Sequence, residues 1–356
     1  MSSLLTPHPR TRFVLPDDSV ATEPAEYRGL ERDGIRLLAA TPAGITHHRF
    51  HELTDLLEPG DLLVVNTSPT LPASLEGVLE TGERRRVHVS TPLDNRDWVI
   101  EVRLADNSGP ERGLHVGATV QIPGGHELQI LSAYPDVSAA GTRLWRAAPL
   151  STISHAPYLR RYGRPITYGY QPRRFPLADY QSVYAMDAES DPVGSAEMVS
   201  AGRPISARVL ARAAARGIAV APIVLHAGVS SPESHEPPMP ERFVVPGSTG
   251  RMVQATRAAG GRVVAVGTTV VRALETAARP TGSVPATQGW TDLVMGTKRP
   301  PRVVTGLVSG LHEPEASHLL LLEAVAGPQL VAEAYGAAVA EHYLWHEFGD
   351  SMLFLP

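Results

Sequence analysis

The sequence has 356 residues, of which 43% are hydrophobic and 19% are charged, and its formal net charge is −5. This is the balance of an ordinary globular protein, long enough for roughly one to three domains. The absence of cysteine excludes disulfides, thiolate nucleophiles and cysteine-ligated iron–sulfur clusters. No apolar run approaches the roughly 18 residues of a membrane span, and the first residues lack a secretory h-region. We therefore expect a cytoplasmic protein without a membrane segment.

The first half of the chain predicts one helix, one buried strand and then a β-rich unit. Apolar residues recur at helical spacing over 47–57, and the segment EPG that follows ends the pattern. The mostly apolar run DLLVVN at 61–66 is typical of a buried strand. From about 74 to 147, short alternating runs such as RVHVS and WVIEVRL lie between Gly, Pro, Asn and Asp, which predicts a small all-β unit.

After Pro149 the sequence is rich in loop residues to about 200 and then alternates helices with strands. Helical periodicity predicts helices, and apolar runs predict buried strands between them. The expected helices are 205–218, 252–260, 268–278 and a stretch within 315–345, and the expected strands are 218–226 and 261–267. We expect an α/β catalytic domain formed by 1–70 and 150–356, interrupted by an inserted β domain formed by 71–149.

The segment VVAVGTTVVRALE at 263–275 is the most informative stretch of the chain. A buried strand that turns through Gly267 into a helix capped by Thr268 or Thr269 presents N–H groups and hydroxyls to a carboxylate, phosphate or ribose oxygen. Arg272 and Glu275 could then bind an amino-acid tail or a sugar diol. The alternative is an ordinary strand–helix junction without a ligand.

Two histidines stand where a general base would be useful. His226 follows a buried strand, and strand ends in α/β proteins face the ligand crevice. His312 lies in the loop segment SGLHEP. Either histidine could instead be structural. The loop GSAEMVSAG at 194–202 is by itself a weak signal for binding a phosphate or an amino acid. The histidines at 47, 48 and 51 lack a third ligand at a suitable spacing, so we predict no metal site.

Two basic segments, RRYGRP at 160–165 and QPRRF at 171–175, are interleaved with tyrosines. Arginine next to aromatic residues can hold a nucleic-acid strand and stack its bases. A solvated loop rich in Arg, Tyr and Pro explains the same pattern.

Ten blocks of the sequence occur in an order that resembles the S-adenosylmethionine:tRNA ribosyltransferase-isomerase family of queuosine biosynthesis. The most specific are PGDLLVVN and GTTVVRALE, and the others include LPASLEG, APYL, YQSVYA, GSAEMVSAG, VLHAG, ERFVVP, LHEP and a C-terminal block ending in YLWHEFGDSMLFL. The resemblance covers nearly the whole chain. It implies a split α/β barrel-like catalytic body with an inserted small β-barrel domain.

The resemblance also implies an activity. The family transfers the ribosyl part of S-adenosylmethionine to a 7-deazaguanine base in tRNA, releases adenine and methionine, and requires no metal. The sulfonium acidifies the C5′ hydrogens, so a positioned base can remove one of them. Carried over to this sequence, the catalytic residues are His226, His312 and Glu241. The residues expected to bind S-adenosylmethionine are Gly267, Thr268, Thr269, Arg272, Glu275, Tyr184, Gln181 and Ser195.

Several blocks depart from the family pattern. The segment NTSPT at 66–70 lacks the usual acid and arginine, Pro204 replaces a histidine, and Glu315 stands where arginine is expected. Such changes suggest that the cofactor end of the site is retained and the acceptor end is remodelled. We therefore keep open a small-molecule acceptor, a lyase or cyclase acting without tRNA, and an inactive S-adenosylmethionine-binding protein.

Overall fold

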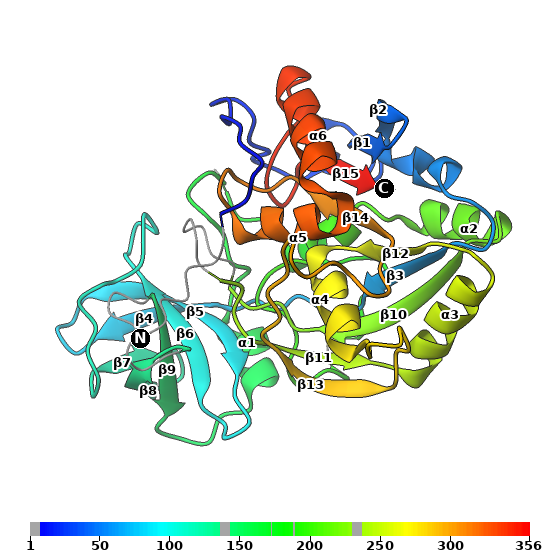
Figure 1. Cartoon of the computed structure of the whole chain (residues 1–356). Coiled ribbons are helices and arrows are strands. Elements are labelled where there is room, and N and C mark those ends of the chain that lie inside the picture. Colours follow the sequence, from blue (N-terminus) through cyan, green and yellow to red (C-terminus); the bar gives the residue numbers. More distant parts are fainter. Residues whose placement is uncertain (1–7, 136–142, 172, 188, 230–236) are drawn as a thin grey trace.

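The computed structural model describes residues 8–135, 143–171, 173–187, 189–229 and 237–356. It contains a large mixed sheet covered by helices on both faces and a closed six-stranded β-barrel beside it (Figure 1). The expected combination of an α/β body with an inserted β-barrel is confirmed. Within the described ranges, no helix has the length and apolar character needed to cross a membrane.

The large sheet has nine strands, with β13 and β2 at its edges. Four central strands are parallel, because β3 pairs with β10 and β12, and β12 pairs with β14. Their carboxyl ends therefore meet at one edge of the sheet. In spatial order the strands are β13 (Thr287–Thr291), β11 (Glu241–Val245), β10 (Ala219–Leu225), β3 (Leu62–Asn66), β12 (Val263–Val266), β14 (Gly306–Gly310), β15 (Ser351–Phe354), β1 (Arg36–Thr41) and β2 (Gly44–Arg49).

The central strands are apolar along their whole length because both faces of the sheet are covered. In β12, Val263 and Ala265 belong to the core on one face, whereas Val264 and Val266 belong to the core on the other. The first face carries α3 (Gly247–Ala258), α4 (Thr268–Ala277), α5 (Ser317–Ala326) and α6 (Pro328–Ala340). The second carries α2 (Ala207–Ala215) and the 3₁₀-helix η2 (Phe50–Leu56).

The barrel is inserted between β3 and α1 (His155–Tyr162), and α1 packs on the barrel core. Its strand order is closed by the pairing of β4 with β7. Around the barrel the strands are β4 (Ser74–Leu79), β5 (Arg84–Pro92), β6 (Trp98–Arg103), β9 (Leu144–Pro149), β8 (His126–Ala133) and β7 (Thr119–Ile122).

The helix expected over 47–57 is wrong in its first part. His47 and His48 lie in β2, where they face Leu38 and Leu37 of β1 across an antiparallel ladder. Helical structure begins only at Phe50, as a 3₁₀-helix. Pairing with the preceding strand in a hairpin outweighs the local helical spacing at these two residues.

Candidate active site at the carboxyl edge of the sheet

A cavity of about 300 Å³ lies at the carboxyl edge of the parallel strands, where the body faces the barrel. Strand ends and the loops that follow them supply most of its wall, as expected for an open α/β sheet. The predicted residues that line it are Glu241, Gly267, Thr268, Thr269, Arg272 and His312. Arg143, Tyr168, Tyr170, Glu197, His318, His346 and Glu347 also line it, and the sequence motifs did not single them out as site residues.

The N-terminus of α4 opens into this cavity. Gly267 turns the chain from β12 into α4 with a φ of 97°, a conformation that side chains other than glycine rarely adopt. Thr268 and Thr269 form the first turn of the helix, whose free N–H groups favour an anion. The hydroxyl of Thr269 is buried and has no hydrogen-bond partner in the described structure. An incoming oxygen atom would therefore find unused donors at this point.

Glu241 and Arg272 form a buried ion pair on the cavity wall. The Arg272 guanidinium also donates to the carbonyl oxygens of Met239 at 2.9 Å, Thr291 at 3.0 Å and Leu293 at 3.2 Å. Burial raises the pKa of the Glu241 carboxyl, and Arg272 opposes that rise. Because its donors are already engaged, Arg272 holds Glu241 in place rather than standing free for a ligand carboxylate.

His312 lies at the end of β14 and stacks on His318, with ring centroids 4.4 Å apart and planes at 6°. Its Nε2 is 3.0 Å from the hydroxyl oxygen of Ser309. Burial holds the pKa of His312 well below the usual 6.5 and lowers that of His318 to about 4. Both rings are therefore neutral at pH 7, and a neutral imidazole can accept a proton.

Tyr168 and Tyr170 form an aromatic wall on the barrel side of the cavity. The hydroxyl of Tyr168 donates to Glu197, and that of Tyr170 donates to Glu347. Tyr170 also stacks on His346, with ring centroids 4.3 Å apart. Burial raises the pKa of Glu347. The wall thus offers flat rings, each tyrosine fixed by a carboxyl group, on which a planar base could stack.

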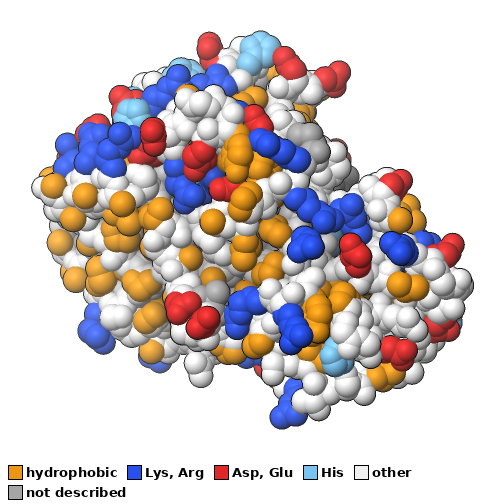
Figure 2. Space-filling model, turned by 180° about the vertical axis from the view of Figure 1, so that it is seen from behind, with side chains coloured by type: hydrophobic (Ala, Val, Ile, Leu, Met, Phe, Trp, Pro, Cys, Tyr) orange, Lys and Arg blue, Asp and Glu red, His pale blue; other side chains and the backbone are white. Residues whose placement is uncertain are grey.

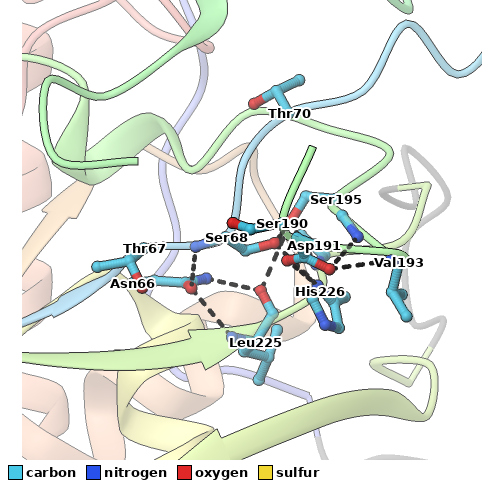
Figure 3. Close-up of polar contacts among 12 residues, drawn as sticks. Asn66, Thr67, Ser68, Thr70, Ser190, Asp191, Val193, Ser195, Leu225 and His226 are labelled. Atoms are coloured by element: carbon cyan, nitrogen blue, oxygen red, sulfur yellow. Dashed lines mark hydrogen bonds and ion pairs between the residues drawn. The ribbon is translucent and has the colours of Figure 1, made fainter. Parts of the chain in front are cut away.

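His226 is not in the lining of the cavity. It takes part in a polar network with residues that follow β3 and with Asp191 and Ser195 (Figure 3). Its Nδ1 is 2.9 Å from the Ser68 hydroxyl and 3.7 Å from the Asp191 carboxylate. The Ser195 hydroxyl donates to Ser68 at 2.7 Å and accepts the N–H of Ala227 at 3.0 Å. Burial lowers the pKa of His226, and Asp191 opposes that effect.

The end of β3 is tied to the end of β10 within the same network. The Asn66 side chain donates to the Leu225 carbonyl at 2.8 Å and accepts the Leu225 N–H at 3.0 Å. It also accepts the N–H of Ser68 at 3.1 Å. Asn66 therefore fixes the turn that carries Ser68 toward His226 (Figure 3).

Three further predicted residues lie outside the cavity lining. The Glu275 carboxylate accepts three successive backbone N–H groups, from residues 302 to 304, at 2.7 to 3.0 Å. Gln181 bonds both the N–H and the carbonyl of Thr70, at 3.0 and 2.7 Å. Tyr184 packs against Gly202, where a Cβ would lie 2.0 Å from its hydroxyl oxygen.

The missed site residues carried little local signal. Tyr168 and Tyr170 appeared only as part of an Arg/Tyr-rich loop, and Glu197 stands inside the weak GSAEMVSAG motif. His318 and Glu347 reach the cavity only through packing between distant segments. The described residues contain no group of three or more His, Cys, Asp or Glu suited to hold a metal ion.

An α/β sheet whose strand ends line a cavity beside a β-barrel is the arrangement of a two-part enzyme with its site between the two parts. The model of a family described as queuosine biosynthesis protein matches residues 10–354. The S-adenosylmethionine:tRNA ribosyltransferase-isomerase of Gloeobacter violaceus is 35% identical over 97% of this chain and 94% of its own length. That of Moorella thermoacetica is 34% identical, over 96% and 98%.

A solved structure agrees with these matches. The S-adenosylmethionine tRNA ribosyltransferase of Thermotoga maritima superposes with a TM-score of 0.53 and 28% identity, covering 96% of this chain and 99% of that one. The chain belongs to the S-adenosylmethionine:tRNA ribosyltransferase-isomerase family. The resemblance inferred from its motifs, and with it the transferase-isomerase class of enzyme, is confirmed.

Proposed function

We propose that this chain binds S-adenosylmethionine in the cavity, removes a C5′ proton and transfers the rearranged ribosyl group to a 7-deazaguanine base in tRNA. The observation that carries the proposal is that one cavity combines the N-terminus of α4, where the Thr269 hydroxyl has no partner in the described structure, with a neutral imidazole. The helix N-terminus suits the methionine carboxylate, and the imidazole suits removal of a C5′ hydrogen that the sulfonium has made acidic. The activity for which the relatives from Gloeobacter violaceus and Moorella thermoacetica are named supports the same substrates.

Each wall of the cavity has a part in this proposal. The N–H groups and hydroxyls of Thr268 and Thr269 bind the methionine carboxylate, and Gly267 lets the backbone approach it. The tyrosine wall stacks the adenine. Glu241, held in place by Arg272, accepts a hydrogen bond from the ammonium or a ribose hydroxyl.

His312 is our choice for the base, because it lines the cavity and is neutral. It takes the C5′ proton, the ribose ring opens and adenine leaves. An amine carried by the 7-deazaguanine base then attacks the rearranged ribosyl group, and methionine departs as a neutral thioether. We give His226 a positioning role, because Ser68 and Asp191 already occupy its Nδ1 side. Ser195, Gln181, Tyr184 and Glu275 support the loops around the cavity.

The test follows the release of adenine and methionine from S-adenosylmethionine by mass spectrometry, with and without tRNA. We expect His312→Gln to lower the rate by about 10²-fold or more, since general-base groups contribute about 10²–10⁴-fold. His226→Gln should retain more activity, and the exposed His115→Gln serves as the matched control. Full activity of His312→Gln would refute its role as base.

Two further points belong to the proposal. The reaction as written takes no metal, so a chelator such as EDTA should leave the rate unchanged, and a loss reversed by added metal would contradict this. A tRNA acceptor would also place the reaction in the cytoplasm.

A second candidate function rests on the altered motifs, in particular NTSPT at 66–70 and Glu315. It is cleavage or cyclisation of S-adenosylmethionine without tRNA, or transfer to a small-molecule acceptor. Release of adenine at the same rate without RNA would favour it over the tRNA reaction. Binding of S-adenosylmethionine without release of either product would instead indicate an inactive binding protein.

A further inference from the structure

A second hollow, of about 850 Å³, lies on the barrel, and neither the cavity nor the proposed chemistry uses it. Strands β4 and β5, the β7–β8 turn and the segment after α1 form its walls. Arg84 and Arg86 come from β5, whereas Arg164 and Arg174 come from the segment after α1. We call these four side chains and the hollow they line the arginine groove.

The arginine groove carries a net positive charge. In the described part of the chain, none of its four arginines forms an ion pair, whereas the neighbouring Arg85 pairs with Glu111 at 2.7 Å. Burial, together with the positive charges of Arg174 and Arg103, lowers the pKa of Arg86. Glu76 and Glu127 are the acids in the lining. The groove is therefore locally positive, although the chain as a whole has a net negative charge.

An aromatic side chain and an anchored backbone complete the groove. Tyr162 lies in the lining, 4.9 Å from the ring of Tyr158. The backbone of Arg164 exchanges two hydrogen bonds of 2.9 Å with Ser74 of β4. The segment after α1 is thus fixed to the barrel, so Arg164 is held against the groove rather than carried on a free loop.

One short segment joins the groove to the cavity. Arg164 and Arg174 line the groove, while Tyr168 and Tyr170, between them in the sequence, line the cavity. A chain whose one unit entered the cavity would therefore have its neighbours close to the groove. On the face opposite to that of Figure 1, Figure 2 shows Lys and Arg side chains gathered along the junction of the larger and smaller lobes.

We propose that the arginine groove binds the phosphate backbone of the RNA whose target base enters the cavity. The proposal rests on the proposed function for its RNA substrate and adds the surface that holds it. Unpaired guanidinium groups in an open groove suit successive phosphates, and Tyr162 suits an unstacked base.

The test measures binding of fluorescein-labelled bacterial tRNA by anisotropy at several salt concentrations between about 50 and 200 mM. The variants are Arg84→Gln with Arg86→Gln, and Arg164→Gln with Arg174→Gln. The control is Arg251→Gln with Arg279→Gln, which removes the same charge from exposed sites on the body. Each groove pair should weaken binding roughly 50-fold and reduce the salt slope by about 2, whereas the control should change affinity less than about 2-fold.

Calorimetric binding of S-adenosylmethionine separates this proposal from the proposed function. Groove variants that bind S-adenosylmethionine with normal affinity but bind tRNA more weakly would support the groove as the RNA-binding surface. Equal tRNA affinity in all three variants and the native protein would overturn the proposal that the groove binds RNA. The proposal that the cavity binds S-adenosylmethionine would still stand. Native protein that binds S-adenosylmethionine but no tRNA would overturn both the groove and the tRNA acceptor.

Discussion

The cavity and the arginine groove share one segment, 164–174, whose two ends line the groove and whose middle lines the cavity, yet their charged side chains are paired to different extents. In the cavity, Arg272 pairs with Glu241, and the carboxyl groups facing the tyrosines accept their hydroxyls. In the groove, four arginines form no ion pair within the described residues and outnumber the two acids of the lining. A site whose charges are paired suits a small zwitterion recognised by shape and hydrogen bonds. A site with excess positive charge suits a polyanion and should be sensitive to salt.

The largest effect is expected from breaking the ion pair of the cavity. Arg272→Met leaves the Glu241 carboxylate buried without its partner, which should lower the free energy of unfolding by about 3–5 kcal/mol and abolish turnover. Chemical denaturation measures the first effect and adenine release the second. Adding Glu241→Gln to this variant should restore part of the stability, because no uncompensated charge then remains.

The matched control for that change is Arg212→Met. Arg212 pairs with Asp55 at 2.8 Å, but both side chains are about 40% exposed. A pair of this kind contributes less than about 1 kcal/mol. If both variants lost the same stability, the claim that the buried Arg272–Glu241 pair matters more than the exposed Arg212–Asp55 pair would be contradicted.

An intermediate effect is expected from pH, and it concerns the barrel interior. His88 of β5 is fully buried, and burial together with Arg103, Arg86 and Arg143 lowers its pKa to about 3. In the unfolded chain its pKa is about 6.5, so below pH 6.5 the unfolded state binds the proton first. The free energy of unfolding should therefore fall as pH falls from 6.5 toward 3, by up to about 1.4 kcal/mol per pH unit from this group.

Denaturant titrations at several pH values check this slope. His88→Phe keeps a ring in the barrel but removes the titration, so its stability should depend less steeply on pH below 6.5. His115→Phe, at an exposed position of the same region, is the control. An unchanged slope in His88→Phe would show that this histidine does not set the acid limit of the barrel.

The central strands of the sheet could be predicted from the sequence. The apolar runs at 61–66, 218–226 and 261–267 match β3, β10 and β12, because strands buried on both faces leave a continuous local signal. The turn at Gly267 was expected at a strand end, and the ligand-binding and catalytic roles of the site residues remain predictions. The domain boundaries at 70/71 and 149/150 remain a prediction.

Features formed by contacts between distant segments could not be predicted. The error over β2 has a different cause: β1 and β2 form a hairpin with a two-residue turn, and the apolar members of the helical pattern begin only at Phe50, in the 3₁₀-helix that follows. The arginine groove joins Arg84 and Arg86 to Arg164 and Arg174, about 80 residues apart, so only half of it appeared as a basic segment. The engagement of Arg272 by three carbonyl oxygens is likewise a product of packing.

The smallest effect is expected from Glu315, which replaces the arginine expected in the family. Glu315 is not in the lining of the cavity or of the groove, and it pairs with Arg12 at 3.3 Å with both side chains exposed. Glu315→Arg should therefore change the free energy of unfolding by less than about 1 kcal/mol. Calorimetry should show unchanged binding of S-adenosylmethionine, because the cavity keeps its paired charges.

The same variant sharpens the contrast between the two surfaces. If RNA is held by the arginine groove, one more positive charge at residue 315 should raise tRNA affinity at low salt only slightly, by less than about 10-fold. Glu315→Gln separates removal of the negative charge from its reversal. A gain of tRNA-dependent adenine release by 10²-fold or more in Glu315→Arg would instead place the acceptor contact at residue 315, away from the groove.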